Sequence, residues 1–139
     1  MTTAMSGLSK ARERGSSTAE LAILLPVLLL TTVGIVDFGR IVSARNMLSN
    51  AARDATRYAS VRSIDSEDPA THEAIRERVI AGLEVLDPAA LEVETIWLPT
   101  NAPGNSVQVR LAYRFEPISP VMPIGLRRLS ASSTMIISY

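Results

Sequence analysis

A glycine, a serine and a glutamate near the start of the chain have the types and spacing for one proteolytic step followed by one ion pair. Gly15, Ser16 and Glu20 stand directly before a long apolar run. A cut between Gly15 and Ser16 would give Ser16 a new α-amino group and make Glu20 the fifth residue of the shortened chain. An α-amino group has a pKa of about 7.7–8.0 and is mostly cationic at neutral pH. It is therefore a natural partner for Glu20, within one chain or between neighbouring chains.

The same residues also permit a purely structural interpretation. Ser17 and Glu20 have the spacing of a capping box, in which a serine hydroxyl and a glutamate carboxylate satisfy the first backbone N–H groups of a helix. Both interpretations can hold at once, because the same residues would begin the helix that follows. The sequence leaves this choice open.

Other residues with catalytic potential are few. His72 is the only histidine and is expected on the exposed side of a helix, and the chain has no cysteine, so the sequence predicts no metal site and no thiol chemistry. Glu92 and Glu94 would lie on one face of a strand, about 6.5–7 Å apart. Such a carboxylate pair could serve hydrolysis, but a solvated strand face is the favoured interpretation. We therefore expect no enzymatic activity and no cofactor.

One short motif is misleading. Asp37-Phe38-Gly39 spells the metal-binding triplet of protein kinases. A kinase also needs a lysine on the nucleotide phosphates, and the only lysine here is Lys10, in the N-terminal tail. The triplet is therefore expected to have a structural role.

Gly15, Ser16 and Glu20 must be positioned by the segment that follows them. That segment is an uncharged run, Leu21 to Val36. Its sixteen residues would span about 24 Å as a helix, close to the ~30 Å hydrocarbon core of a bilayer, and neighbouring residues can extend the span to about 18–38. Basic residues precede the run, as the positive-inside rule requires for a cytoplasmic N-terminus. A buried helix of a soluble protein and a cleaved secretory signal are the alternatives. Pro26 should kink the helix.

The stretch from Arg14 to Val61 resembles the TadE-like family of pilus-assembly proteins. The shared features are a Gly-then-Glu cleavage region, an apolar run containing Leu-Pro, an acidic-Phe-Gly-Arg element and an Ala-Ala-Arg pattern. The residues that carry them are Gly15, Ser16, Glu20, Pro26, Asp37, Phe38, Gly39, Arg40, Ala52, Arg53 and Arg57.

This resemblance implies a minor pilin or pseudopilin of a Flp/Tad-type pilus. The implied partners are the membrane, a prepilin peptidase that removes the leader, and other pilins and pilus-assembly proteins. The implied mechanism is helix-mediated assembly, with no catalytic residues. Two alternative functions remain: a membrane-anchored extracytoplasmic binding module that does not polymerise, and an anchored hydrolase that uses Glu92 and Glu94.

After Asp37 the helix becomes amphipathic. Apolar and small residues recur every seven positions in two rows, at Ile41, Leu48 and Ala55 and at Ala44, Ala51 and Tyr58. Small side chains let helices approach closely, so this stripe suits either packing in a filament or packing on the chain's own sheet. On the polar side, Asp54 is within reach of Arg57 at i+3.

The remaining residues predict a small α+β head. Asp68-Pro69 is expected to cap a helix that continues to about Leu86. Alternating apolar residues then predict three strands, near 91–97, 107–115 and 129–139, separated by loops rich in proline and glycine. We therefore expect a pilin-like α+β fold, in which a long N-terminal helix is followed by a short helix and a three-stranded antiparallel sheet.

The predicted organisation is a basic cytoplasmic leader (1–15), a long helix (16–62) and an extracytoplasmic head (63–139). Charge follows these divisions: residues 37–62 carry a net +3 and residues 63–96 a net −7. No segment is basic and aromatic enough to predict nucleic-acid binding. The expected location is the inner or cytoplasmic membrane, crossed once.

Overall fold

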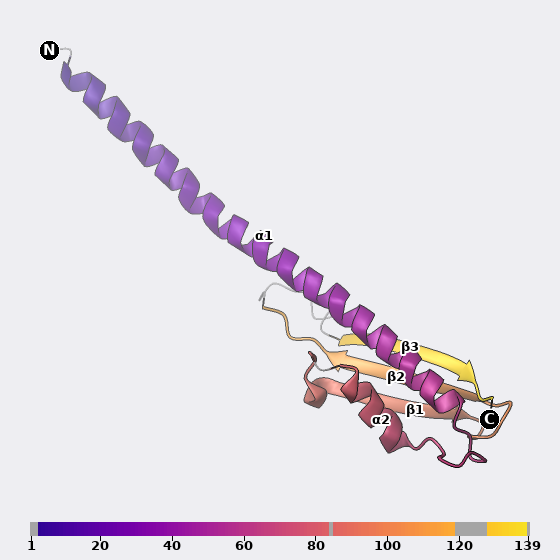
Figure 1. Ribbon diagram of the computed structural model, residues 1–139. Helices are drawn as coiled ribbons and strands as arrows, with labels where there is room; N and C mark the ends of the chain where they lie inside the picture. The colour runs from indigo at the N-terminus through magenta and orange to yellow at the C-terminus, as the bar shows by residue number, and fades with distance from the viewer. Residues whose placement is uncertain (1–2, 84, 119–127, 139) are drawn as a thin grey trace.

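The computed structural model describes residues 3–83, 85–118 and 128–138. One very long helix, α1 (Thr3–Ser60), is followed by α2 (His72–Ala81), a 3₁₀ helix η1 (Pro88–Ala90) and three strands, β1 (Leu91–Leu98), β2 (Ser106–Arg114) and β3 (Arg128–Ile136). The head packs along the C-terminal half of α1, and the N-terminal half of α1 projects away from it (Figure 1). The predicted α+β architecture is confirmed.

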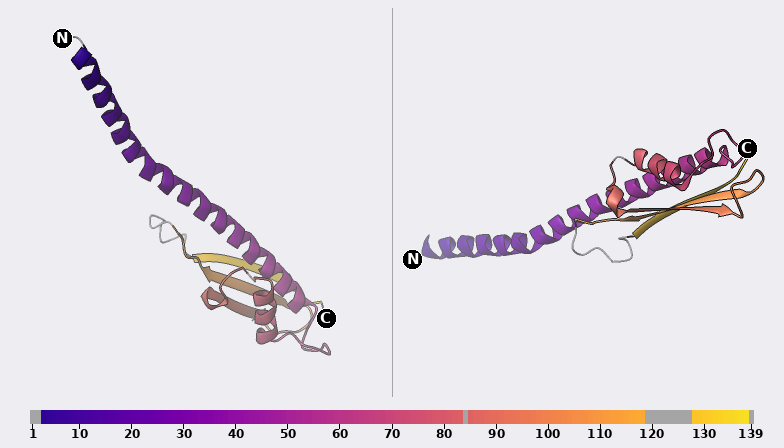
Figure 2. Two further views of the ribbon diagram at one scale, coloured as in Figure 1. Left: turned by 60° about the vertical axis from the view of Figure 1, so that its left-hand side comes forward. Right: turned by 90° about the horizontal axis from the view of Figure 1, so that it is seen from below.

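The strands form one antiparallel sheet in the order β1-β2-β3, with β2 in the centre. Its inner face alternates as the sequence predicts: Val107, Val109 and Leu111 are buried, and the residues between them are more exposed. Both helices cover the same face of the sheet, so the head has two layers (Figure 2, right). Within the described residues, no helix covers the opposite face.

The stripe of small residues on α1 packs against the chain's own sheet. Leu48, Ala52 and Ala55 are fully buried there, together with Val109 and Leu129 of the sheet. Because alanine has only a methyl side chain, α1 can lie close to the strands along this stretch. Of the two uses that the sequence allows for this stripe, the structure assigns packing on the head.

The bounds predicted for the second helix are wrong at both ends. Thr71, not Asp68, is the N-cap, and its hydroxyl accepts a hydrogen bond from the backbone N–H of Ala74 at 3.1 Å. The helix ends at Ala81, because the following Gly82 has low helix propensity and its backbone N–H bonds back to the last turn. Asp87, which directly follows the predicted end at Leu86, caps η1 by accepting from the N–H of Ala89.

At its N-terminal end, α1 extends beyond the predicted range of 16–62. The helix runs without interruption through residues 15 and 16. Ser17 therefore lies inside the helix and is not its N-cap, so the capping-box interpretation is wrong for the uncut chain. α1 changes direction in its N-terminal half (Figure 2, left), which is the half that contains Pro26.

Two predictions concern residues near the end of the chain. The proline-rich crossing from Glu116 to Arg128 lies mostly outside the described residues. The last strand ends at Ile136, and the backbone then joins the end of α1 through the N–H of Ser138, which donates to the carbonyl of Ser60 at 2.8 Å. Tyr139, predicted as part of this strand, is also outside the described residues.

Candidate functional site

The apolar half of α1 leaves its large side chains exposed. Nearly all apolar residues between Leu21 and Val36 are at least two-fifths exposed, and this part of α1 touches little of the head. The two hydroxyl groups in the run are satisfied inside the helix, because Thr31 and Thr32 each donate to the carbonyl four residues earlier at 2.8 Å. One helix of the described chain is thus long and apolar enough to cross a membrane.

The residues of the candidate cleavage site lie on α1 just before this run. Glu20 is exposed, and among the described residues no ion pair involves it. Ser16 is four residues away, or one helical turn of about 6 Å. A charged carboxylate at the edge of an apolar helix is costly in a membrane without a partner. The nearest candidate cation is the amine that a cut after Gly15 would create.

The acidic-Phe-Gly-Arg element holds the head against α1. Asp37 is the first charged residue after the apolar run, and it is fully buried. Its carboxylate accepts hydrogen bonds from Arg40 Nη1 at 3.1 Å and from the backbone N–H of Ile118 at 3.0 Å. Arg40 Nη1 also donates to the carbonyl of Glu116 at 3.4 Å, and its guanidinium lies 5.0 Å from the ring centre of Phe115. The element therefore pins the segment after β2 to the helix.

The two residues between Asp37 and Arg40 face away from the head. Phe38 is 67% exposed. Gly39 is also exposed, and a Cβ added there would meet no atom within 4 Å, so the head does not require a glycine at this position. A surface without a side chain lets a second helix approach closely. The glycine at position 39 is thus better explained by a close contact with a neighbouring helix than by a requirement of the head's own fold.

The Ala-Ala-Arg pattern divides between two faces of α1. Ala52 is in the core, whereas Arg53 and Arg57 are exposed on the opposite side of the helix. Within the described residues, no hydrogen bond or short ion pair involves the side chain of either arginine. Of these three motif residues, the two arginines are the ones that a partner could reach.

The hydrogen-bonded partner of Asp54 is on α2, although the charge of Arg57 one turn along α1 also acts on it. Its carboxylate accepts from Arg78 Nε at 2.8 Å, across to α2, and not from Arg57 one turn along α1. This hydrogen bond, together with the charges of Arg78 and Arg57, lowers the pKa of Asp54 below its ordinary value of 3.8. The same contact raises the pKa of Arg78. The ring of Tyr58 lies beneath the guanidinium groups of Arg62 and Arg78, 4.0 Å and 5.7 Å from its centre.

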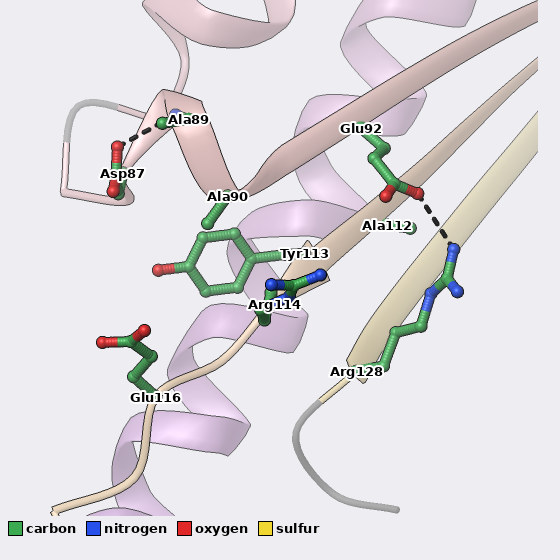
Figure 3. Close-up of a pocket in the computed structure, with 9 residues that line it drawn as sticks. All are labelled: Asp87, Ala89, Ala90, Glu92, Ala112, Tyr113, Arg114, Glu116 and Arg128. Atoms are coloured by element: carbon green, nitrogen blue, oxygen red, sulfur yellow. Dashed lines mark hydrogen bonds and ion pairs between the residues drawn. The ribbon is translucent and has the colours of Figure 1, made fainter.

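On the outer face of the sheet, both candidate catalytic glutamates are paired with arginines. Glu92 contacts Arg128 at 2.9 Å and Glu94 contacts Arg110 at 3.7 Å. Figure 3 shows the first pair on one side of a groove of about 520 Å³, with Tyr113 and Glu116 on the other side. Glu94 and Arg110 are directly opposed on neighbouring strands, whereas Glu92 on β1 reaches across β2 to Arg128 on β3. Both glutamates therefore face arginines on the exposed side of the sheet.

The histidine lies at the edge of the head. His72 is exposed at the first turn of α2, with its ring 6.3 Å from that of Trp97 in an edge-to-face arrangement. Among the residues that the structure describes, no group of three or more histidines, aspartates and glutamates could hold a metal ion.

These features define a class: a protein with one helix able to span a membrane, which continues directly into a small α+β head. Residues 15–57 match the family model described as TadE-like protein, so this part of the chain is similar to TadE-like proteins. The match begins at Gly15, ends at Arg57 and excludes α2 and the sheet. It suggests involvement in Tad pilus assembly. No curated protein and no solved structure matches the chain.

Proposed function

We propose that this chain is a minor pilin or pseudopilin of a Flp/Tad-type pilus, with its N-terminus in the cytoplasm and its head outside. The observation that carries the proposal is the family match over the apolar helix, which begins at the glycine before the candidate cut. The exposed apolar half of α1 supports membrane insertion. In this role the chain acts by assembly and not by catalysis.

The first step of the proposed mechanism is removal of residues 1–15 by a prepilin peptidase. The cut exposes the amine of Ser16 one turn from Glu20, and the two opposite charges can pair in the low dielectric at the membrane edge. A pair with the Glu20 of a neighbouring subunit would align two helices. The helix is continuous at this bond, so the peptidase must open at least one turn of α1 before it cuts.

The second step is lateral contact between subunits through α1. The alanine stripe is buried under the head, which leaves the opposite face of the helix for partners. That face carries Gly39, Arg53 and Arg57. Its arginines suit partners that present carboxylates, because a guanidinium binds a carboxylate with two hydrogen bonds. We therefore place the assembly contacts on this polar face and not on the alanines.

The test of this function is the N-terminus of the mature chain. We expect mass spectrometry of the membrane fraction to find a peptide that begins at Ser16. Gly15→Val should block the cut, because a branched side chain keeps the peptidase from the backbone. Gly7→Val, the same substitution eight residues earlier, is the matched control and should be processed normally. If the native chain keeps residues 1–15 in cells that make the pilus, the proposal is wrong.

A further inference from the structure

The segment after β2 is fixed beside α1 at the point where the apolar run ends. The backbone N–H of Ile118 lies 3.0 Å from the Asp37 carboxylate, and Asp37 is the residue directly after Val36. Side chains on a helix lean toward its N-terminus, which here is the side of the apolar run. Ile118 therefore lies at about the level of Asp37 along the helix axis.

The depth of this point follows from the length of the run. Its centre lies between residues 28 and 29, so Asp37 is about 13 Å away along the axis at 1.5 Å per residue. Half of a bilayer's hydrocarbon core is about 15 Å thick. A helix centred in the membrane thus puts Asp37 and Ile118 at the boundary between acyl chains and head groups.

The side chains at the level of Asp37 and Ile118 are of the kinds that suit the boundary between acyl chains and head groups. Phe38 and Ile118 are 67% and 62% exposed, although both are large and apolar. Ile35 and Val36, which directly precede Asp37 on α1, are exposed as well. Asp37 is instead fully buried, and its hydrogen bonds to Arg40 and Ile118 replace those that water would make. A carboxylate at the edge of the hydrocarbon needs such partners.

We propose that the segment at Ile118, together with Phe38, is a second membrane contact, which seats the head on the bilayer surface. This inference rests on membrane insertion of α1. Ile118 enters the boundary region beside the transmembrane helix, and Asp37 holds it there. The head is then attached at two points and cannot tilt freely about α1. Its outer sheet face and the arginine-bearing face of α1 would keep fixed directions relative to the membrane.

Tryptophan fluorescence in nanodiscs tests this inference. The chain has a single tryptophan, so Trp97→Phe gives a silent background in which Ile118→Trp can be read alone. The full chain is placed, one copy per disc, in phosphatidylcholine brominated on its acyl chains. Leu28→Trp reports the centre of the span, and Thr134→Trp reports the exposed far end of β3. We expect brominated lipid to quench Leu28→Trp and Ile118→Trp strongly and to leave Thr134→Trp unchanged.

Each outcome decides the question. Quenching at position 28 without quenching at position 118 would overturn the second contact and leave the membrane anchor intact. A blue-shifted but unquenched signal at position 118 would mean that protein covers it, which also overturns the inference. Loss of quenching at both positions would overturn the anchor and the inference together.

A second variant tests the role of Asp37. Adding Asp37→Ala to the Ile118→Trp chain should reduce quenching markedly, because the segment loses its attachment to α1. Asp54→Ala, which removes an exposed carboxylate elsewhere on the helix, is the matched control and should not change it. Circular dichroism of both variants shows whether the head remains folded. Unchanged quenching in the folded Asp37→Ala chain would contradict the proposed attachment.

Discussion

Glu20 is the residue on which the proposed assembly mechanism depends most directly. It is exposed at the edge of the apolar run, and it lies inside α1, away from the N-terminus of the helix. A helix-capping role is therefore excluded in the uncut chain. The remaining role for the Glu20 carboxylate is to pair with the amine that cleavage would create, one turn away.

We predict that Glu20→Ala leaves membrane insertion and cleavage largely intact but reduces incorporation into the pilus system. The reason is that the cut chain would keep an unpaired α-amino group at the membrane edge. Pilus assembly is measured in cells that carry the variant, with Glu13→Ala in the leader as the matched control. Normal assembly by Glu20→Ala would show that the carboxylate has no partner in the assembled state.

Asp54 and Arg78 join α1 to α2, and this pair should make the head sensitive to acid. Because the pKa of Asp54 is lowered in the folded state, the pair stabilises the fold above the ordinary pKa of 3.8 and loses its effect as pH falls below it. Both side chains are about half exposed, so solvent screens the interaction and the effect should be small.

We therefore predict that Asp54→Asn lowers the melting temperature of the head slightly at about pH 6 and has little further effect at about pH 3. Arg78→Gln should cause the same loss, and the double variant should lose no more than either single one. Thermal unfolding in detergent measures all three. Fully additive losses would show that the two side chains act independently.

At the scale of elements, α1 has two faces with separate tasks. One face forms the core of the head with its alanines, and the other presents exposed arginines. Neighbouring residues of the Ala-Ala-Arg pattern thus belong to different interfaces. This division makes it possible to alter the fold and the proposed assembly contact separately.

We predict that Ala52→Leu destabilises the head by about 1–3 kcal/mol, because three extra carbons must fit into a filled core. Arg53→Leu, at the next position, should leave the free energy of unfolding within about 0.5 kcal/mol of the native chain, as is usual at exposed sites. It should instead weaken incorporation into the pilus system. Denaturant unfolding and a pilus-assembly assay measure the two effects. A stable Ala52→Leu head would show that the core has space that the structure does not indicate.

For the whole molecule, the size and charge of the head favour an accessory role. The head adds two short helices and a sheet to α1, and residues 63–96 carry a net −7. Copies of this chain packed side by side would bring those carboxylates together, and like charges repel. The exposed arginines of α1 suit contact with a different, acidic neighbour instead.

We predict that the chain is far scarcer than the principal pilin in sheared pili, because the shaft is built from other subunits. Quantitative proteomics of the pilus fraction measures the ratio, with the membrane fraction of the same cells as the reference. An abundance equal to or above that of every other pilin would contradict the accessory role, even if cleavage occurs after Gly15.

The sequence by itself determined the features that depend only on a local pattern of residues. The uncharged run defined the candidate membrane span, the alternation at Val107, Val109 and Leu111 defined the central strand, and the motif from Gly15 to Arg57 carried the resemblance to TadE-like proteins. Each of these signals lies within one segment. Periodicity and composition are therefore sufficient to detect it.

Only the tertiary structure decided which distant groups meet. It placed Ile118 on Asp37 and Arg78 on Asp54, across 81 and 24 residues, where local spacing favoured Arg57 for the second pair. It also assigned the alanine stripe to the head, which the sequence left undecided between head and filament. The reason is physical: a helix face has the same pattern whatever covers it, and a salt bridge follows three-dimensional distance, not distance along the chain.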